Sequence, residues 1–306
     1  MSIRNAALIG TGAVGGVYAM HLHNTYGMEF YVVAGDSRKK RIEQNGIKVN
    51  QMTYYPQLIE PSETKHKMDL IIIAVKNYDL EQAIEDIQNL VKVGTIILPL
   101  LNGITASDRL CVAYPKAKIM LGLSMGIDAI RTEEGIVNTD DGVIQFGYED
   151  NTVKAKEVNE VLCYLTKAGI QAKVYSDMKR MQWRKWMLNV GVNQASAITG
   201  AKFKYFGRNK ELFTLFRNAM VEVLELAKAA NVKITMEDIT HIEEVILNFT
   251  PEGKTSMLQD VEAMRKTEID YFAGTVIEYG VKYHVPTPVN EVLYLALKAK
   301  ENIYLD

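Results

Sequence analysis

A glycine pattern near the start of the chain constrains the fold more than any other feature. The residues Gly10-Thr11-Gly12-Ala13-Val14-Gly15 match G-x-G-x-x-G and stand between an apolar run, Ala6–Ile9, and an amphipathic segment from 13 to about 23. A strand, this pattern and a helix in that order predict a dinucleotide-binding βαβ unit. A glycine turn that closes such a unit without a ligand is the less favoured alternative.

Each glycine has a separate task in such a unit. Gly10 permits the tight turn, Gly12 lets the backbone approach a pyrophosphate, and Gly15 lets the helix pack closely on the strand. The helix N-terminus then presents free N–H groups to the anion. We therefore expect the dinucleotide to contact the whole loop: Gly10, Thr11, Gly12, Ala13, Val14 and Gly15.

The first half of the chain alternates strand-like and helix-like segments. Apolar runs recur at residues 30–34, 70–75 and 96–98. Such runs between helices predict a doubly wound parallel α/β sheet. Residues 135–137 and 143–146 predict a hairpin. A helix near 152–168 and a strand near 171–174 complete a predicted Rossmann-type dinucleotide-binding domain over residues 1–175.

The second half is predicted to be an all-α C-terminal domain, residues 176–306. Its amphipathic segments span 212–230, 239–249, 256–283 and, after two prolines, 289–303. We expect this helical domain to bind the substrate and carry the catalytic residue, with a cleft between the two domains that closes to exclude water.

Three polar side chains recur at four-residue steps within the apolar stretch 183–193, namely Lys185, Asn189 and Asn193. On an α-helix such a step turns only about 40° past a full circle, so the three predict one polar stripe. Burying an ammonium and two amides is costly unless they find partners. A bound polar ligand would be such a partner.

Two further polar residues follow predicted strands of the sheet. Lys76 follows the strand at 70–75, and Asn102 follows the strand at 96–98. Ligands of doubly wound folds bind at these carboxyl ends of the strands. An exposed loop lysine and an ordinary Asn-Gly turn are the alternatives.

Residues 256–259 have the form of a capping box, S-x-x-Q, and predict the start of a long helix. Ser256 is interpreted either as an N-cap or as a contact, at this helix start, for a ligand carboxylate. Glu268 would lie about 18 Å away on the same straight helix. We therefore expect Glu268 near the cofactor or Lys185, the alternative being an exposed charge paired with Lys266 or Arg265.

The choice of cofactor depends on the segment after the second predicted strand. Asp36 lies near the position where an acid would hold the ribose 2′-OH of NAD(H), but just past the strand end. Arg38 and the cations of 39–41 follow, and a guanidinium there suits a 2′-phosphate. A solvated first turn of the next helix is the alternative. We predict NADP(H), with Arg38 as a contact and NADH as the second choice.

The composition argues against several classes of partner. A net charge of -2 over 306 residues gives no indication of nucleic acid or an anionic membrane, and no apolar run approaches a membrane span. Cys111 and Cys163 lack metal-ligand spacing and are expected to be buried small hydrophobes in a reducing cytoplasm, with no metal site. Residues 1–5 run directly into a predicted strand, so we expect no signal peptide.

Taken together, these motifs resemble the ketopantoate reductase (2-dehydropantoate 2-reductase) family over nearly the full length. The resemblance rests on the loop at 10–15, Lys76, Asn102-Gly103, Trp183-Arg184-Lys185 with Asn189 and Asn193, and the segments 256–260 and 267–271. Two departures stand out. The family often has an arginine at the end of the second strand, where this chain reads Ala34-Gly35-Asp36, and residues 252–255 lack an expected asparagine.

The resemblance implies an enzyme that reduces ketopantoate to pantoate with NADPH, in pantothenate and coenzyme A biosynthesis. It implies Lys185 as the proton donor, and Asn189, Asn193 and Ser256 as substrate contacts. Asn102 would meet both ligands, whereas Lys76 and Glu268 would lie beside the cofactor.

The implied mechanism depends on the pKa of Lys185, because this side chain has to give up a proton. A hydride reaches the ketone carbon while Lys185 protonates the oxygen. Burial would lower the pKa of this lysine, and a carboxylate such as Glu268 would raise it.

Three questions stay open at this level. The enzyme could be a related NAD(P)H-dependent reductase of another small 2-keto acid. A non-catalytic NADP(H)-sensing protein is the rival from a different class, but it would not need the polar stripe. The helical domain could form a homodimer, although no heptad pattern predicts a coiled coil.

Overall fold

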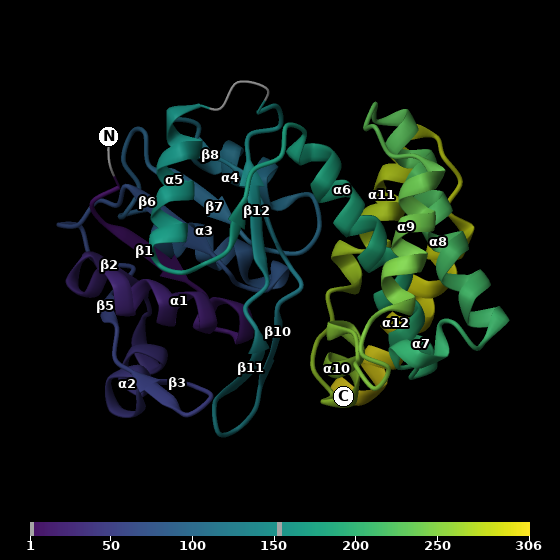
Figure 1. Ribbon diagram of the computed structural model, residues 1–306, viewed down its shortest axis with the longest axis horizontal. Helices are drawn as coiled ribbons and strands as arrows, with labels where there is room; N and C mark the ends of the chain where they lie inside the picture. The colour runs from purple at the N-terminus through teal and green to yellow at the C-terminus, as the bar shows by residue number, and fades with distance from the viewer. Residues whose placement is uncertain (1–2, 152–154) are drawn as a thin grey trace. The chain divides into compact units, whose positions relative to one another are not determined.

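The computed structural model describes residues 3–151 and 155–306, and Figure 1 traces the chain. These residues divide into two compact units, one ending at Lys179 and the other running from Arg180 to Asp306. The predicted boundary after residue 175 falls shortly before this division. In the described ranges, each helix is too short or too polar to cross a membrane. Residues 1–2, part of the segment examined for a signal peptide, lie outside the described residues, as do residues 152–154 of the predicted helix near 152–168.

The first unit alternates strands and helices, as predicted. Its elements are β1 (Ala6–Ile9), α1 (Ala13–Tyr26), η1 (Gly27–Glu29), β2 (Phe30–Val33), α2 (Asp36–Asn45), β3 (Ile47–Val49), β4 (Met52–Tyr54), β5 (Gln57–Ile59), β6 (Leu70–Ile73), η2 (Asn77–Asp79), α3 (Leu80–Ile87), β7 (Ile96–Pro99), α4 (Ala106–Ala113), β8 (Lys118–Ile119), β9 (Leu121–Met125), β10 (Asp128–Arg131), β11 (Ile136–Asp140), β12 (Val143–Gly147), α5 (Lys156–Lys167) and β13 (Ala172–Lys173).

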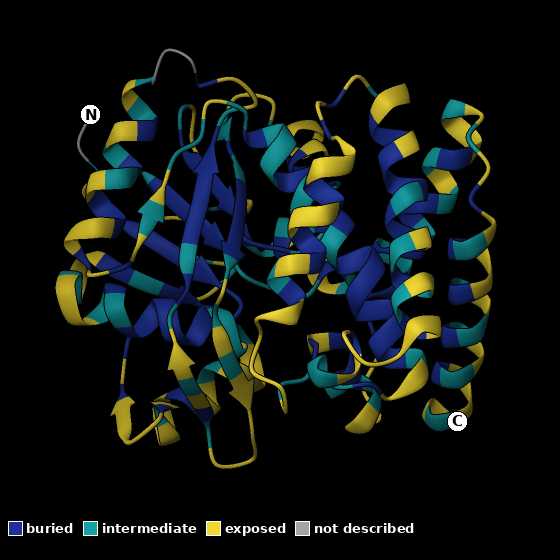
Figure 2. Cartoon of the chain, turned by 45° about the vertical axis from the view of Figure 1, so that its right-hand side comes forward, coloured by how far each residue is buried: buried dark blue, intermediate teal, exposed yellow. Residues whose placement is uncertain are grey.

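A parallel sheet in the order β5-β2-β1-β6-β7-β8 forms the centre of this unit. Ala6 and Leu8 of β1 face one apolar core, to which α1 and α5 contribute, whereas Ala7 and Ile9 face a second core with α3 and α4. The central strands are therefore covered on both faces, which explains their unbroken apolar sequences. Figure 2 shows these strands as buried. The doubly wound Rossmann-type prediction is confirmed.

The predicted hairpin of residues 135–137 and 143–146 is wrong. β11 pairs with β10 and β3, whereas β12 pairs with β9 and β13 in another sheet. The chain changes sheet at Gly142, whose φ is 63° and where an added Cβ would lie 2.5 Å from the backbone of both Met125 and Ile127. The sequence shows the turn, but β11 pairs instead with the preceding strand β10 and the distant β3, and β12 pairs with β9 and β13.

The second unit is helical in its described elements, as predicted. They are α6 (Met178–Leu188), which begins at the end of the first unit, η3, a π-helical turn (Asn189–Asn193), α7 (Gln194–Thr199), η4 (Phe203–Tyr205), α8 (Lys210–Ala229), α9 (Met236–Leu247), α10 (Ser256–Glu262), η5 (Ile269–Tyr271), α11 (Ala273–Tyr283) and α12 (Pro288–Leu305). Helix α8 packs against η3, α11 and α12.

The single long helix predicted over residues 256–283 is also wrong. Helix α10 ends at Glu262, and Met264 takes a left-handed backbone conformation with a φ of 50°. The N–H of Arg265 then donates to the carbonyl of Asp260 (2.8 Å), which closes the helix end. Helical structure resumes at η5 and α11, so the apolar periodicity continued across an interruption that it could not reveal.

The expectation of buried cysteines is wrong as well. Cys111 on α4 and Cys163 on α5 are both exposed, and both are free thiols. They lie on the solvent-facing sides of amphipathic helices, where residue type alone is a poor guide to exposure.

A buried carboxylate connects two helices of the second unit. Glu222 of α8 accepts hydrogen bonds from the N–H groups of Val289 (2.7 Å) and Asn290 (3.0 Å), at the start of α12. The side-chain amide of Asn290 donates to the same carboxylate (2.7 Å). A negative charge at a helix N-terminus is favourable, and here it also satisfies free backbone donors.

We predict that Glu222→Gln lowers the free energy of unfolding of the second unit by about 1.5–3 kcal/mol, because an amide offers one acceptor oxygen and no charge. Glu225→Gln, on the same helix but with an exposed carboxylate paired with Lys228, should cost less than about 1 kcal/mol. Urea denaturation followed by tryptophan fluorescence tests this, because both tryptophans, Trp183 and Trp186, lie in that unit. Equal effects of the two variants would contradict the prediction.

Candidate active site

The glycine loop has the geometry that a dinucleotide requires. Gly10 has a φ of 99°, and a Cβ there would lie 2.6 Å from the backbone of Ala74 at the end of β6. A Cβ on Gly15 would lie 1.9 Å from the carbonyl oxygen of Gly10. Gly12 differs, since nothing lies within 4 Å of an added Cβ there. The tight turn expected at Gly10 and the close packing expected at Gly15 are present, and the backbone at Gly12 is open.

The start of α1 is suited to an anion. Gly12 is the N-cap of this helix, and its first turn carries no acidic residue. The positive end of the helix dipole is therefore not offset locally. Thr11 is buried, Gly12 is exposed, and Ala13 and Val14 are partly exposed.

The loops that carry Lys76 and Asn102 are tied together by a residue that the sequence analysis missed. Asn77, which is 1% exposed, donates its side-chain amide to the backbone carbonyl of Asn102 (2.8 Å). Lys76 and Asn102 are both partly exposed. Because the two loops leave adjacent strands, β6 and β7, the structure brings these predicted residues to one edge of the sheet. The sequence signal that could have identified Asn77 is its place directly after Lys76, just beyond the end of a predicted strand.

The segment after β2 carries one acid and several cations. Asp36 begins α2 in a left-handed conformation, with a φ of 46°, and is exposed. Arg38 is exposed on the first turn of the same helix. Lys39, in contrast, is paired with Glu60 (2.5 Å). Arg38 is therefore less constrained by protein partners than its neighbour.

In the second unit, the polar stripe continues from α6 into a π-helical turn. Lys185 lies on α6, and Asn189 and Asn193 begin and end the π-turn η3. Both asparagines are 6% exposed. In the part of the chain that the structure describes, no group forms a hydrogen bond with the side-chain amide of Asn189. A buried amide without a protein partner is available to a ligand. π-turns occur frequently at functional sites.

The electrostatic environment of Lys185 follows the expectation. Burial lowers its pKa to about 8, and the negative charge of Glu268 acts in the opposite direction. Its neighbour Arg184 has a structural role instead, lying 3.3 Å from the buried carboxylate of Asp238. The two neighbouring cations therefore have different carboxylates close to them, Glu268 for Lys185 and Asp238 for Arg184.

Ser256 is not the N-cap that the capping-box pattern predicted. Thr255 is the N-cap, and its hydroxyl accepts from the N–H of Leu258 (3.2 Å). Ser256 is exposed, and its Oγ lies 3.5 Å from the side-chain nitrogen of Asn193, at the long limit of hydrogen bonding. The shift by one residue leaves the Ser256 hydroxyl next to the polar stripe and outside the helix cap.

Glu268 lies on the segment that interrupts the predicted long helix. It is therefore not on the helix of Ser256, and the estimate of about 18 Å between the two does not apply. It is 4% exposed, which excludes the alternative of an exposed charge. Its effect on the pKa of Lys185 places it near that ammonium.

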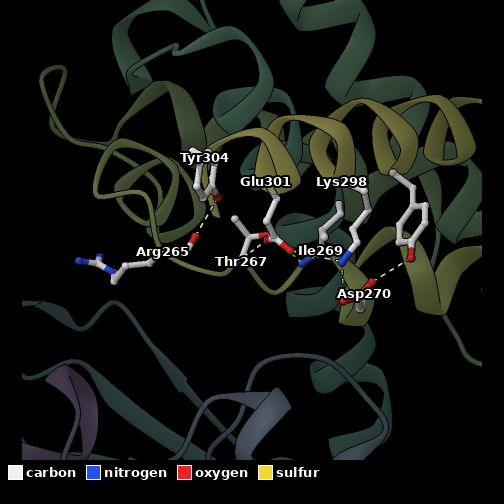
Figure 3. Close-up of polar contacts among 8 residues, drawn as sticks. Arg265, Thr267, Ile269, Asp270, Lys298, Glu301 and Tyr304 are labelled. Atoms are coloured by element: carbon white, nitrogen blue, oxygen red, sulfur yellow. Dashed lines mark hydrogen bonds and ion pairs between the residues drawn. The ribbon is translucent and has the colours of Figure 1, made fainter. Parts of the chain in front are cut away.

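The segment that carries Glu268 is fixed by a network of polar contacts on α12 (Figure 3). Glu301, which is 2% exposed, accepts from the N–H and the hydroxyl of Thr267, both at 2.6 Å. Lys298 donates to Glu301 (3.3 Å) and to Asp270 (3.2 Å). These bonds hold the residues on both sides of Glu268, so the backbone that carries its carboxylate is tied to α12.

A second anchor connects this segment to α6. The indole N–H of Trp186 donates to the carbonyl of Tyr271 (3.1 Å), and Trp183 and Trp186 both lie against the ring of Tyr279. The helix of Lys185 and the segment of Glu268 are therefore held to each other. Thr267, Glu301 and Trp186 were not predicted as site residues, because their partners are distant in sequence.

The predicted residues thus form two groups. The glycine loop, Arg38, Lys76 and Asn102 belong to the first unit, and Lys185, Asn189, Asn193, Ser256 and Glu268 belong to the second. A surface hollow of about 540 Å³ in the second unit is lined by residues from the end of α7, η4 and the start of α8, such as Thr199, Tyr205 and Leu215, and by none of the predicted site residues.

Comparison with known protein families shows to which family this chain belongs. The family model described as Ketopantoate reductase PanE/ApbA matches residues 6–151, and the model of the C-terminal part of the same family matches residues 177–301. The chain belongs to the ketopantoate reductase family. It is accordingly an oxidoreductase of this family, with the fold described above.

Similar proteins match nearly the whole chain. The 2-dehydropantoate 2-reductase of Lactococcus lactis subsp. lactis is 27% identical over 97% of this chain and 97% of its own length. The crystal structure of 2-dehydropantoate 2-reductase from Geobacter metallireducens has a TM-score of 0.85 and 25% identity, covering 96% of this chain and 99% of that one. The structure of D-mandelate dehydrogenase with NADH and anilino(oxo)acetate has a TM-score of 0.88 and 26% identity, covering 99% and 100%.

We predict that Glu268→Gln lowers the pKa of Lys185 further below about 8, because it removes the carboxylate that favours the ammonium while burial remains. An NMR titration of lysines labelled at Cε measures this directly. Glu243→Gln is the matched control, since it removes another buried carboxylate of the same unit, one paired with Arg217. An unchanged pKa in Glu268→Gln would contradict the assigned interaction.

Proposed function

We propose that the protein reduces ketopantoate to pantoate with NADPH, as a step of pantothenate and coenzyme A biosynthesis. The observation that carries this proposal is the polar stripe of the partly buried Lys185 and the buried Asn189 and Asn193, with Glu268 beside the lysine and Ser256 beside Asn193. Membership of the ketopantoate reductase family supports the choice of substrate.

The residues of the first unit fit a nicotinamide dinucleotide. The open backbone at Gly12 and the start of α1 would receive the pyrophosphate, and Arg38 would contact the adenosine end. Lys76 and Asn102 would lie beside the cofactor, and Asn102 would also contact the substrate. When bound, the reduced nicotinamide supplies the hydride.

Lys185 would act as the proton donor. A lysine with a pKa near 8 is largely protonated at neutral pH, yet it gives up its proton more readily than an ordinary lysine. Its ammonium would stabilise the negative charge that develops on the ketone oxygen and then protonate that oxygen. Glu268 would keep the lysine charged until the proton is transferred.

The amides and the serine would select the substrate. Asn189 and Asn193 would donate to and accept from the carbonyl and hydroxyl groups of the keto acid, and the Ser256 hydroxyl would bind its carboxylate. Such buried polar groups discriminate strongly, because an analogue without the matching group leaves them unpaired. The homodimer expected from the sequence stays a prediction.

A second candidate function is the reduction of another small 2-keto acid with NADH. Two observations favour it: the likeness to D-mandelate dehydrogenase crystallised with NADH, and the presence of Asp36 near the position where an acid would hold a ribose 2′-OH. A protein that senses NADP(H) without chemistry is less well supported, because it would have no use for a lysine with a lowered pKa beside two buried asparagines.

One assay separates these candidates. Oxidation of NADPH and of NADH is followed at 340 nm with ketopantoate and, in parallel, with a panel of 2-keto acids that includes phenylglyoxylate. The proposal expects the highest kcat/KM for ketopantoate with NADPH. A higher kcat/KM for another keto acid, or turnover with none of them, would contradict it.

We predict that Lys185→Ala lowers kcat by about two to four orders of magnitude while the affinity for NADPH stays within a few-fold. Lys185→Arg should also be slow, because a guanidinium retains the charge but does not release its proton near neutral pH. Lys179→Ala, on the same helix with a side chain paired with Glu149, serves as the control. Single-turnover kinetics would report the loss, and near-normal turnover in Lys185→Ala would refute the role.

We predict that Ser256→Ala raises the KM for the keto acid with little loss of stability. Thr255→Ala is the matched variant, because Thr255 supplies the helix cap; it should destabilise the protein by about 1 kcal/mol and leave the KM nearly unchanged. Steady-state kinetics and thermal melting of both variants distinguish the two roles. If Ser256→Ala instead lowered the melting temperature without changing the KM, the serine would be structural.

A further inference from the structure

One cation at the glycine loop has no role in the family pattern described above. Arg131 is the last residue of β10, far in sequence from the loop, and its guanidinium Nη1 donates to the backbone carbonyl of Thr11 (2.7 Å). Thr11 is the second residue of the fingerprint. A side chain from a strand outside the parallel sheet therefore reaches the dinucleotide-binding turn itself.

The strand that carries Arg131 is firmly placed on this turn. Its neighbour β11 packs Ile136 against Gly16 of α1, where an added Cβ would lie 2.2 Å from the Ile136 Cδ1 atom. From β4, the Tyr54 hydroxyl donates to the carbonyl of Gly16 (2.8 Å). The β10-β11-β3-β4 sheet is thus attached to the first turns of α1, and the position of Arg131 is a property of the fold.

Two further arginines lie close to this guanidinium. The positive charges of Arg41 and Arg38, on α2, add to partial burial in lowering the pKa of Arg131. No carboxylate in the described ranges 3–151 and 155–306 forms an ion pair with any of the three arginines, whereas Lys39 between them is paired with Glu60. Three guanidiniums gathered without a counter-ion repel one another, and a bound polyanion would relieve that repulsion.

We propose that Arg131, together with Arg38 and Arg41, forms a binding site for the ribose 2′-phosphate of the dinucleotide and sets the preference for NADPH over NADH. This cluster of three arginines would take the role of the arginine that the family often has at the end of β2, where this chain reads Ala34-Gly35-Asp36. The inference rests on the proposed function only in taking the ligand to be a nicotinamide dinucleotide.

The position of the cluster favours the 2′-phosphate over the pyrophosphate. The pyrophosphate lies at the N-terminus of α1 in this type of fold, and the adenosine ribose lies towards the end of β2. Arg38 and Arg41 belong to the helix that directly follows β2, and the guanidinium of Arg131, which contacts Thr11, is close enough to both for their charges to act on it. Guanidiniums bind a phosphate monoester through paired N–H donors, which suits them for this group.

Nucleotide affinity tests the inference without any need for turnover. Isothermal titration calorimetry on the full chain measures Kd for NADPH, NADH, adenosine 2′,5′-bisphosphate and 5′-AMP. Arg131→Ala should weaken NADPH and the bisphosphate by about 10- to 100-fold, the usual effect of losing a charge-assisted hydrogen bond, and leave NADH and 5′-AMP nearly unchanged. Arg41→Ala, whose side chain is exposed, should show the same selectivity even if Arg131→Ala folds poorly.

The controls separate selectivity from general charge. Lys40→Ala removes an exposed cation of the same helix that is not among those near Arg131, and its affinity for NADPH should stay close to that of the parent protein. Equal losses of affinity for NADPH and NADH would assign Arg131 to the pyrophosphate and overturn the inference. Unchanged affinity for the bisphosphate in Arg131→Ala would also overturn it. Failure to reduce ketopantoate would count against the proposed function alone.

Discussion

The chemistry proposed for the second unit depends on how the charge of one lysine is balanced. Burial on an apolar helix disfavours the ammonium of Lys185, and Glu268 restores part of its stability. The carboxylate can do this only if it is held in place, which explains the bonds of Glu301 to Thr267 and of Trp186 to Tyr271. These contacts of Thr267 and Tyr271 therefore support the interaction between two opposite charges.

The two units bind charge by different physical means. In the first unit, backbone N–H groups, a helix dipole and exposed guanidiniums are arranged for an anion, and none of these groups needs to change its protonation. In the second unit, the stripe consists of two buried side-chain amides and a lysine whose pKa is lowered. The first arrangement suits binding, and the second suits transfer of a proton.

The sequence predicted what depends on local periodicity and missed what depends on distant partners. The β1–loop–α1 unit, the alternating first half and the polar stripe followed from patterns within about twenty residues. The hairpin at 135–146 failed because pairing with β3 and β9 cannot be seen locally, and the long helix failed because Met264 adopts a conformation unusual for its type. The N-cap was predicted at Ser256 and is Thr255, because two neighbouring residues that both carry a hydroxyl cannot be told apart as caps from the sequence.

The π-turn at Asn189–Asn193 also restricts how the chain could vary in length. A π-turn holds one more residue than the α-helical turn that it replaces. Deleting a residue there would restore a regular helix and rotate everything that follows by about 100°. Gln194, whose side-chain amide donates to Asn290 (3.0 Å), would then face away from its partner, and Asn193 would leave Ser256. The spacing of the asparagines is thus coupled to the packing of α7 on α12, so that a deletion at the site would also disrupt the core.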